Sequence, residues 1–220
     1  MDRKKYLIVT AGGTGTRMGS SCPKQFLEIG GRAILHVTIS KFLEAFPDIK
    51  VIVTLPKDHI EGWKKYCYER NFHCPQTIVA GGLTRFHSVK NGLEKVPDGA
   101  LVAVHDGVRP LLSARLIRDL FEAAEASPAV VPSVPVVDTI KTVEGKPVDR
   151  SKLLAVQTPQ IFHSEILKKA YNLPYSTLFT DDASVVEADG VKVSYVAGEK
   201  FNIKVTTPDD LLICKAVLDA

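Results

Sequence analysis

Short apolar runs that alternate with amphipathic helical patterns limit most strongly how this chain can fold. Four runs of strand length, rich in β-branched residues, each end at a glycine, a proline or a polar turn: 5–11, 50–55, 77–80 and 100–104. Apolar residues at helical spacing lie between or after them, over 35–46, 86–93 and 117–124. Strands without polar alternation are covered on both faces, and strands that alternate with helices pair in parallel. The pattern predicts one α/β domain over 1–220, with a doubly wound, mostly parallel, Rossmann-like sheet.

The segment 132–160 departs from this alternation, because two β-rich runs flank a turn signal at 144–147. This predicts a β-hairpin, and a lone hairpin can scarcely bury itself. We therefore expect an arm that projects and packs on a second copy of the chain; a hairpin lying flat on its own domain is the alternative. The remaining predicted elements are helices near 161–171 and 181–188, a strand over 192–196 and a last helix opened by Thr207–Pro208.

Composition narrows the class of protein. The 220 residues carry a formal charge of +3 with scattered Lys and Arg, so no dense basic face for nucleic acid is expected. The four cysteines form no C-x-x-C pair and have no histidine cluster beside them, which argues against a zinc site. No signal peptide is visible and the apolar runs are short, so we expect a cytoplasmic protein with reduced thiols and no membrane segment.

A glycine-rich loop follows the first predicted strand, where doubly wound sheets bind ligands. It reads Ala11–Gly12–Gly13–Thr14–Gly15–Thr16–Arg17–Met18–Gly19, and Lys24 follows. Glycine lets the backbone approach a phosphate and turn N–H groups toward its oxygens, while Arg17 and Lys24 add positive charge. The string matches neither the P-loop nor the dinucleotide fingerprint. These cations favour a phosphate cradle over a plain tight turn.

Asp106 follows the fourth predicted run, and Arg109 stands three residues later. A carboxylate at a strand end can hold Mg²⁺, and the arginine could bind a second phosphate. An Asp–Gly turn with an ion pair to Arg109 fits equally well. Lys204 lies among apolar residues, where a lysine either extends to solvent or is held in a site. The six histidines show no ligand spacing, so no catalytic histidine is expected.

A second glycine pair, Gly81–Gly82, ends the third predicted strand, and Arg85 and Ser88 follow. Backbone groups there could contact the edge of a base, and the hydroxyl of Ser88 could contact a ribose. The alternative is an ordinary helix start, capped by Thr84, with an exposed arginine.

A series of motifs, in this order, resembles the 2-C-methyl-D-erythritol 4-phosphate cytidylyltransferases of the non-mevalonate isoprenoid pathway: AGGTGTRMG, PKQF, AGGLTRFHS, HDGVRP, DTIK, VDRSKLLAVQTPQ, FTDDAS and NIKVTTPDDL. The motifs cover nearly the whole chain. The resemblance implies a nucleotidyltransferase fold and an enzyme that transfers CMP from CTP to methylerythritol 4-phosphate, releasing pyrophosphate. It also implies Mg²⁺ or another divalent cation as cofactor, and a homodimer in which the hairpin arm completes the partner's site.

Carried onto matching positions, the resemblance implies roles for individual residues. The triphosphate would be cradled by Ala11, Gly12, Gly13, Thr14, Gly15, Arg17 and Lys24. Cytosine and ribose would be surrounded by Gly81, Gly82, Arg85 and Ser88. The acceptor would be bound by Asp106, Arg109, Thr139, Arg150, Thr158 and Thr180. Asp106 would also bind the metal, Thr139 and Arg150 would reach across the dimer interface, and Lys204 would join Arg17 and Lys24 as the catalytic set.

Three residues depart from the family pattern. Gly107 and Val108 stand where the family often has two alanines, which leaves the chemistry intact. Leu83 stands where an acid is common, which bears on one base or ribose contact.

Three rival functions remain: a ribitol 5-phosphate cytidylyltransferase, a guanylyl- or uridylyltransferase, and a nucleotide-binding module without catalysis. The strings Asp181–Asp182–Ala183–Ser184 and Val148–Asp149–Arg150 lean away from the first. Retention of the cations and of Asp106 argues against the third.

Overall fold

The apolar runs of the first half pair side by side as parallel strands. The computed structural model describes residues 3–13 and 22–218. The four runs form β1 (Lys5–Thr10), β4 (Lys50–Leu55), β5 (Gln76–Ala80) and β6 (Leu101–Asp106), which pair in parallel. Their order across the sheet is β6-β1-β4-β5. The run predicted for 100–104 continues to Asp106, whose Cα is paired with that of Thr10 in β1. The two strand ends therefore lie next to each other.

Further strands extend the sheet beyond β6: β7 (Ala129–Pro135), β10 (Leu154–Val156), β11 (Gln160–His163) and β12 (Ser194–Ala197). β11 runs antiparallel between β6 and β7, whereas β12 is parallel to β7. The helix predicted near 161–171 is therefore wrong in its first residues, and α5 covers only Ser164–Ala170. A short apolar run carries no periodicity that separates strand from helix, so pairing with both neighbours decides its structure.

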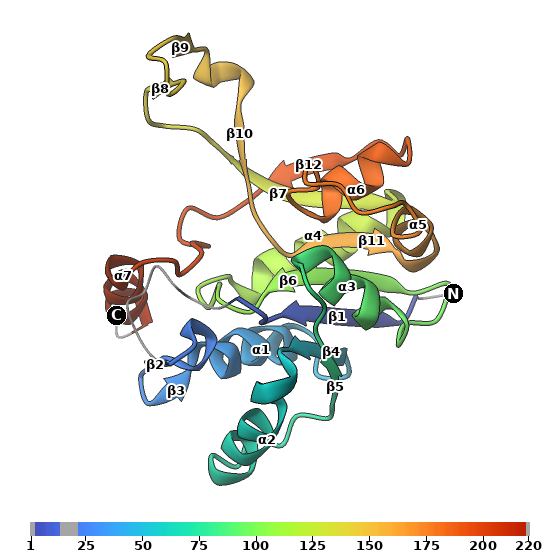
Figure 1. Ribbon diagram of the computed structural model, residues 1–220, viewed down its shortest axis with the longest axis vertical. Helices are drawn as coiled ribbons and strands as arrows, with labels where there is room; N and C mark the ends of the chain where they lie inside the picture. The colour runs from blue at the N-terminus through green and yellow to red at the C-terminus, as the bar shows by residue number, and fades with distance from the viewer. Residues whose placement is uncertain (1–2, 14–21, 219–220) are drawn as a thin grey trace.

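Helices cover both faces of the sheet (Figure 1). One face carries α1 (Ile34–Ala45), α2 (Ile60–Glu69) and α4 (Ala114–Ala126), and the other carries α3 (Arg85–Leu93), α5 and α6 (Asp182–Ala188). In β1, Leu7 and Val9 pack in the core beneath α1, α2 and α4, and Ile8 packs in the core beneath α3, α5 and α6. Successive side chains of a strand point to opposite faces of the sheet. The predicted doubly wound, mostly parallel fold is confirmed, and Thr84 caps α3 as its sequence position suggests.

Shorter elements and a last helix surround the ends of the central strands. They are η2 (Lys24–Phe26), β2 (Glu28–Ile29), β3 (Arg32–Ala33), η3 (Lys57–His59), η4 (Arg150–Lys152) and α7 (Pro208–Leu218). Cys214 of α7 packs in a small core with Ile29 and Val205, which fixes the segment after Lys204 against the body of the domain. Within residues 3–13 and 22–218, no helix combines the length and apolar character needed to cross a membrane.

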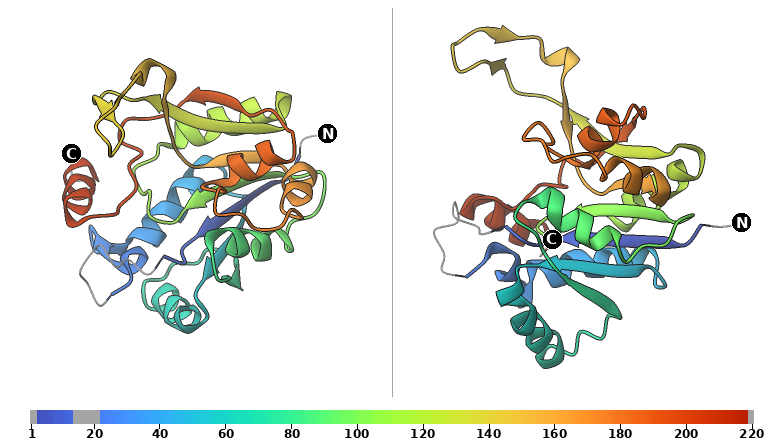
Figure 2. Two further views of the ribbon diagram at one scale, coloured as in Figure 1. Left: turned by 45° about the horizontal axis from the view of Figure 1, so that its top comes forward. Right: turned by 45° about the vertical axis from the view of Figure 1, so that its right-hand side comes forward.

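A hairpin arm projects away from the sheet (Figures 1 and 2). Its strands β8 (Ile140–Lys141) and β9 (Pro147–Val148) pair antiparallel, and Gly145 takes a φ of 84° in the turn between them. The range 132–160 predicted for the hairpin is too wide, because its two ends belong to β7, β10 and β11 of the main sheet. On the arm, Val137 and Val143 are 75% and 100% exposed.

Candidate active site

Two adjoining pockets open at the carboxyl ends of β1 and β6. The first has a volume of about 220 Å³ and is lined by Thr10, Ala11, Gly12, Gly13, Lys24, Gln25, Gly82, Leu83, Thr84, Arg85, Ser88, Asp106, Val108 and Lys204. The second has a volume of about 320 Å³ and is lined by Arg85, Asp106, Arg109, Leu154, Val156, Gln157, Thr158, Gln160, Thr180, Asp181 and Lys204. Arg85, Asp106 and Lys204 line both pockets, and we call these three side chains the shared wall.

The strand order explains why the pockets form here. The chain passes from β1 to β4 and β5 on one side, then returns to β6 on the other side of β1. Connections that leave in opposite directions open a crevice beyond the carboxyl ends of the two central strands. Because Thr10 and Asp106 are register partners at those ends, both line the first pocket. The pockets therefore lie where doubly wound sheets bind ligands.

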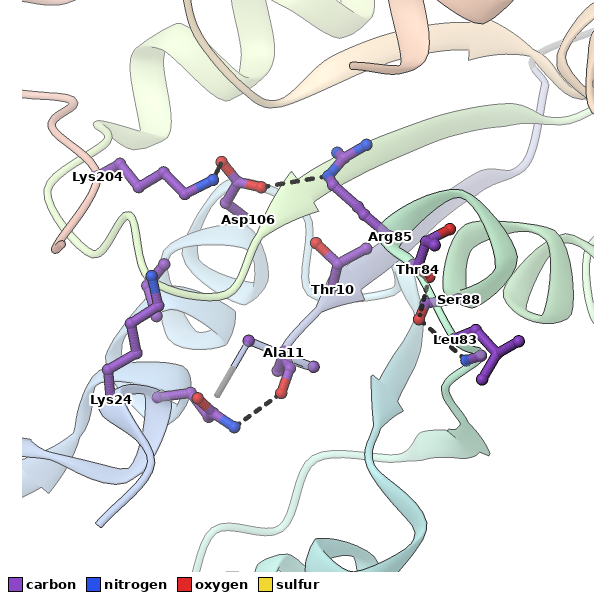
Figure 3. Close-up of a pocket in the computed structure, with 14 residues that line it drawn as sticks. Thr10, Ala11, Lys24, Leu83, Thr84, Arg85, Ser88, Asp106 and Lys204 are labelled. Atoms are coloured by element: carbon purple, nitrogen blue, oxygen red, sulfur yellow. Dashed lines mark hydrogen bonds and ion pairs between the residues drawn. The ribbon is translucent and has the colours of Figure 1, made fainter. Parts of the chain in front are cut away.

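Asp106 is the charged centre of the shared wall, and three cations surround its buried carboxylate. Its Oδ2 atom lies 3.1 Å from Lys204 Nζ and 3.2 Å from Arg109 Nε, and its Oδ1 atom lies 3.5 Å from Arg85 Nε. Figure 3 shows Lys204 and Arg85 approaching Asp106 from opposite sides. Burial alone would raise the pKa of Asp106, but Arg85, Lys204 and Arg109 hold this pKa well below its ordinary range. The carboxylate is therefore ionised at neutral pH.

Thr158 holds the backbone of Asp106 by a hydrogen bond, and His105 in turn holds Thr158. The Thr158 hydroxyl accepts a hydrogen bond from the Asp106 N–H at 3.1 Å and lies 3.0 Å from His105 Nδ1. His105 Nε2 faces the Arg109 carbonyl at 3.3 Å, so Nε2 carries the proton and Nδ1 accepts from the threonine. Burial lowers the pKa of His105 to about 3, with Asp106 acting in the opposite sense and Arg109 in the same sense. At neutral pH His105 is an uncharged support whose two ring nitrogens are both engaged.

The turn from β5 into α3 is closely packed around its glycines. Ser88 Oγ accepts a hydrogen bond from the Gly82 N–H at 3.1 Å and donates one to the Thr84 carbonyl at 3.0 Å. A Cβ atom on Gly82 would overlap the Cβ of His87 and come within 3.0 Å of its carbonyl carbon, so the turn requires glycine there. Leu83 is 98% exposed at the rim of the first pocket, where it offers an apolar surface in place of a charge.

Lys24 and Gln25 reach the first pocket from the short helix η2. Lys24 Nζ donates to the Val205 carbonyl at 3.3 Å, which places its charge between the glycine loop and the segment of Lys204. Gln25 is almost fully buried, and its Nε2 donates to the Ala11 carbonyl at 2.8 Å. Gln25 thereby fixes the carbonyl at the start of the glycine loop.

Comparison with known proteins decides the family. The sequence model of the 2-C-methyl-D-erythritol 4-phosphate cytidylyltransferase family matches residues 6–220. This chain belongs to that family. The cytidylyltransferase of Bacteroides thetaiotaomicron is 46% identical over 218 residues, covering 98% of this chain and 100% of the relative. The cytidylyltransferase of Porphyromonas gingivalis strain W83 is 47% identical over 223 residues, covering 99% of each chain.

Solved structures agree with this assignment. The 4-diphosphocytidyl-2C-methyl-D-erythritol synthase of Anaerococcus prevotii superposes with a TM-score of 0.83 at 27% identity, over 100% of both chains. The 2-C-methyl-D-erythritol 4-phosphate cytidylyltransferase of Thermus thermophilus superposes with a TM-score of 0.78 at 33% identity, over 99% of this chain and 100% of that one. The protein is therefore an enzyme of the nucleotidyltransferase class with the fold of the cytidylyltransferase family.

Most of the residues assigned from the family pattern converge on the two pockets. The first pocket contains Ala11, Gly12, Gly13, Lys24, Gly82 and Ser88, and the second contains Arg109, Thr158 and Thr180, with Arg85, Asp106 and Lys204 in both. Gly81 lines neither pocket, and its N–H bonds to the Leu55 carbonyl at 2.7 Å. Thr139 and Arg150 lie on the arm and line neither pocket, and Arg150 donates to the Val137 carbonyl. Thr14, Gly15 and Arg17 lie outside the described residues.

Three residues that sequence reasoning left without a role also belong to this site. Gln25 holds the glycine loop, Gln157 lines the second pocket, and Asp182 binds Arg85 through both carboxylate oxygens. The strings PKQF, VDRSKLLAVQTPQ and FTDDAS contain these residues. These motifs could have pointed to the three residues, but a motif does not say which side chain is buried or what it contacts.

Asp106 is the candidate metal ligand. Among the residues that the structure describes, no group of three or more His, Cys, Asp or Glu side chains could hold an ion. Mg²⁺ in nucleotide sites usually takes only one or two carboxylates, and phosphate oxygens and waters complete its shell. A single ionised carboxylate between the two pockets fits such a site, in which a bound triphosphate supplies the other ligands.

Proposed function

We propose that this enzyme transfers CMP from CTP to 2-C-methyl-D-erythritol 4-phosphate, giving 4-diphosphocytidyl-2-C-methyl-D-erythritol and pyrophosphate. The observation that carries the proposal is the shared wall. Arg85, Asp106 and Lys204 face both pockets, so two substrates in adjoining pockets meet at one cluster of charges. Membership of the family supplies the identities of the two substrates.

In this proposal the first pocket takes CTP. The backbone at Ala11–Gly13 and the ammonium group of Lys24 receive the triphosphate, together with Thr14, Gly15 and Arg17. The turn at Gly81–Gly82 and Ser88 receives the base and ribose. Close packing of Gly82 against His87 supports this role, because it fixes the backbone of the turn that would face the base.

The second pocket takes the phosphorylated acceptor. Arg109 supplies a guanidinium beside Asp106, and the hydroxyl of Thr180 adds a polar group. The Thr158 hydroxyl is already engaged with His105 and with the backbone of Asp106, so we assign it mainly to holding the wall.

The proposed reaction is a single in-line displacement. A phosphate oxygen of the acceptor attacks the α-phosphorus of CTP. The bond between the α-phosphorus and the oxygen that bridges the α- and β-phosphates breaks, and pyrophosphate leaves with the electron pair. The nucleophile is an anion near neutral pH, because the second pKa of a phosphate monoester is about 6. No general base is needed, and the neutral, fully bonded His105 offers none. Lys24, Lys204 and Arg17 stabilise the charge that grows on the phosphate oxygens.

Asp106 would hold Mg²⁺ or another divalent cation in this scheme. The ion, when bound, neutralises and orients phosphate oxygens. Lys204 and Arg109 lie beside Oδ2 of Asp106, so a metal held through this oxygen would share it with these cations unless they turned to the phosphate groups.

The exposed arm supports a homodimer as part of the proposal. Thr139 and Arg150 lie on the arm, away from both pockets of their own chain, while Val137 and Val143 expose apolar side chains. Packing of the arm on a second copy would bury these valines and bring Arg150 to the partner's acceptor pocket. We also propose the cytoplasm as the compartment, because the reaction uses CTP and all four cysteines are free thiols.

Pyrophosphate release tests the proposed function. The enzyme is incubated with CTP and Mg²⁺, and with methylerythritol 4-phosphate, ribitol 5-phosphate or no acceptor. We expect release with methylerythritol 4-phosphate alone. Release with ribitol 5-phosphate alone would keep the mechanism but overturn the acceptor, and silence in all three reactions would favour a nucleotide-binding module without catalysis. GTP and UTP in place of CTP test the choice of base.

A further inference from the structure

Arg85 is held by a second carboxylate that lies behind the shared wall. Its Nη1 and Nη2 atoms donate to Asp182 Oδ1 and Oδ2 at 2.9 and 2.6 Å, the paired geometry that fixes a guanidinium plane. Only Nε remains directed at Asp106, at 3.5 Å. Both terminal nitrogens of Arg85 are thus engaged, which leaves its charge at the wall but restricts its movement.

Asp182 is the first residue of α6 and is fully buried. An acid at this position could serve only to stabilise the start of the helix. That structural role is already filled by Asp181. The Asp181 side chain accepts a hydrogen bond from the Ser184 N–H at 2.9 Å, and Ser184 Oγ accepts one from the Asp181 N–H at 3.2 Å, which completes a capping box. A buried carboxylate is costly unless it is paired, so Asp182 has its partner in Arg85.

Tyr171 holds Asp182 from the core. Its hydroxyl donates to Asp182 Oδ1 at 2.6 Å, and its ring stacks on Phe86 with centroids 4.6 Å apart. Phe86 follows Arg85 in α3, so the carboxylate and the guanidinium are anchored to the same buried cluster.

We propose that Asp182, held by Tyr171, is a positioning residue that fixes the Arg85 guanidinium at the shared wall and thereby orients the carboxylate of Asp106 between the two substrates. This inference rests on the proposed function. Its contact with the chemistry is indirect: Asp182 touches Arg85, and Arg85 faces Asp106. Loss of the Asp182 charge frees Arg85 to turn, so the reacting groups are less well aligned although both pockets remain.

The first test is Asp182→Asn, which keeps the shape of the side chain. We expect kcat to fall roughly 10-fold while KM for each substrate changes less than about threefold, because alignment is lost and not binding area. Asp189→Asn is the matched control: Asp189 lies at the other end of α6, pairs with Lys169 at 2.9 Å, and should leave kcat unchanged. Wild-type kcat in Asp182→Asn, or a loss confined to KM, would overturn the proposal.

A double variant separates positioning from general destabilisation. If Asp182 acts only through Arg85, adding Asp182→Asn to Arg85→Lys should lower kcat by no more than about twofold, because residues of one network are not additive. If Asp182→Asn lowered kcat in the Arg85→Lys background by as large a factor as it does in the wild type, the proposal would be overturned. If Asp182→Asn does not fold, Tyr171→Phe replaces it, with an expected loss of roughly threefold in kcat that also disappears in the Arg85→Lys background; an unchanged kcat would then contradict the proposal. Turnover by the wild-type enzyme is measured alongside, so a failure of the proposed function itself is recognised separately.

Discussion

Lys204 Nζ lies 3.1 Å from Oδ2 of Asp106, the same oxygen atom that lies 3.2 Å from Arg109 Nε. With Arg85 on the other oxygen, one buried carboxylate holds three cations together at the junction of two pockets. Such an arrangement is poised for anions, because phosphates can take over the cations that the carboxylate now neutralises.

Asp106→Asn removes the charge that holds this cluster together. We expect kcat to fall on the order of 10²-fold, by analogy with the loss of one preorganised electrostatic group. The three cations then repel one another, so the free energy of unfolding should rise with added salt more steeply than in the wild type. Urea unfolding at two ionic strengths measures this, with Asp98→Asn, a mostly exposed acid paired with Lys168, as the control. Equal salt dependence in both variants would count against the electrostatic account.

Lys24→Ala tests the cation of the first pocket. We expect kcat to fall roughly 10²-fold, because an ammonium group that stabilises the transition state is lost. Lys41→Ala is the control, since Lys41 lies on α1 and pairs with Glu44 at 3.6 Å. Turnover of Lys24→Ala close to that of the wild type would remove Lys24 from the catalytic set.

The buried His105 makes stability depend on pH. Its folded-state pKa of about 3 is below the ordinary value of 6.5, so the unfolded chain binds the proton first. Stability from this group is therefore present above pH 6.5 and is lost progressively as the pH falls toward 3. Between pH 7 and pH 5 the free energy of unfolding should fall by about 2 kcal/mol from His105 alone. Urea unfolding of the wild type and of His105→Gln should differ in pH slope by this amount; parallel slopes would show that His105 is not held neutral.

The proposed dimer makes a prediction about mixed subunits. If Arg150 completes the partner's site, Lys24→Ala and Arg150→Ala subunits form heterodimers in which one site contains both native residues. Random exchange between the two weakly active variants should restore about a quarter of wild-type turnover, since half of the dimers are mixed and each has one intact site. If Arg150 served its own chain, every site would stay defective and mixing would restore nothing. Exchange itself is confirmed by mass spectrometry of tagged subunits.

The sequence predicted the parts of the fold whose signals are local. β1 and β4 are apolar runs of strand length. α3 begins after Thr84, whose side chain caps the helix by accepting a hydrogen bond from the His87 N–H. β11 was missed because Gln160–His163 is too short to show a period, and its structure is set by pairing with β6 and β7. The sequence also overstates the length of the hairpin, because the ends of the segment 132–160 pair with strands of the main sheet and no local pattern shows this.

At the site, the sequence indicated which charged residues matter more readily than what they contact. The strand order brings Asp106 next to Thr10, and the family motifs single out Arg85 and Lys204. No local pattern could show that Arg85 gives both terminal nitrogens to Asp182, because 97 residues separate the two in the chain. Burial of Asp182 is likewise a property of the assembled core.

The position of phosphorus transfer tests the central claim most directly. The enzyme is incubated with methylerythritol 4-phosphate and with CTP that carries ³²P at either the α or the γ position, and the acceptor product is isolated. Attack at the α-phosphorus predicts that label from the α position appears in the acceptor product and that label from the γ position leaves entirely as pyrophosphate. Label from the γ position in the acceptor product would contradict nucleotidyl transfer at the shared wall.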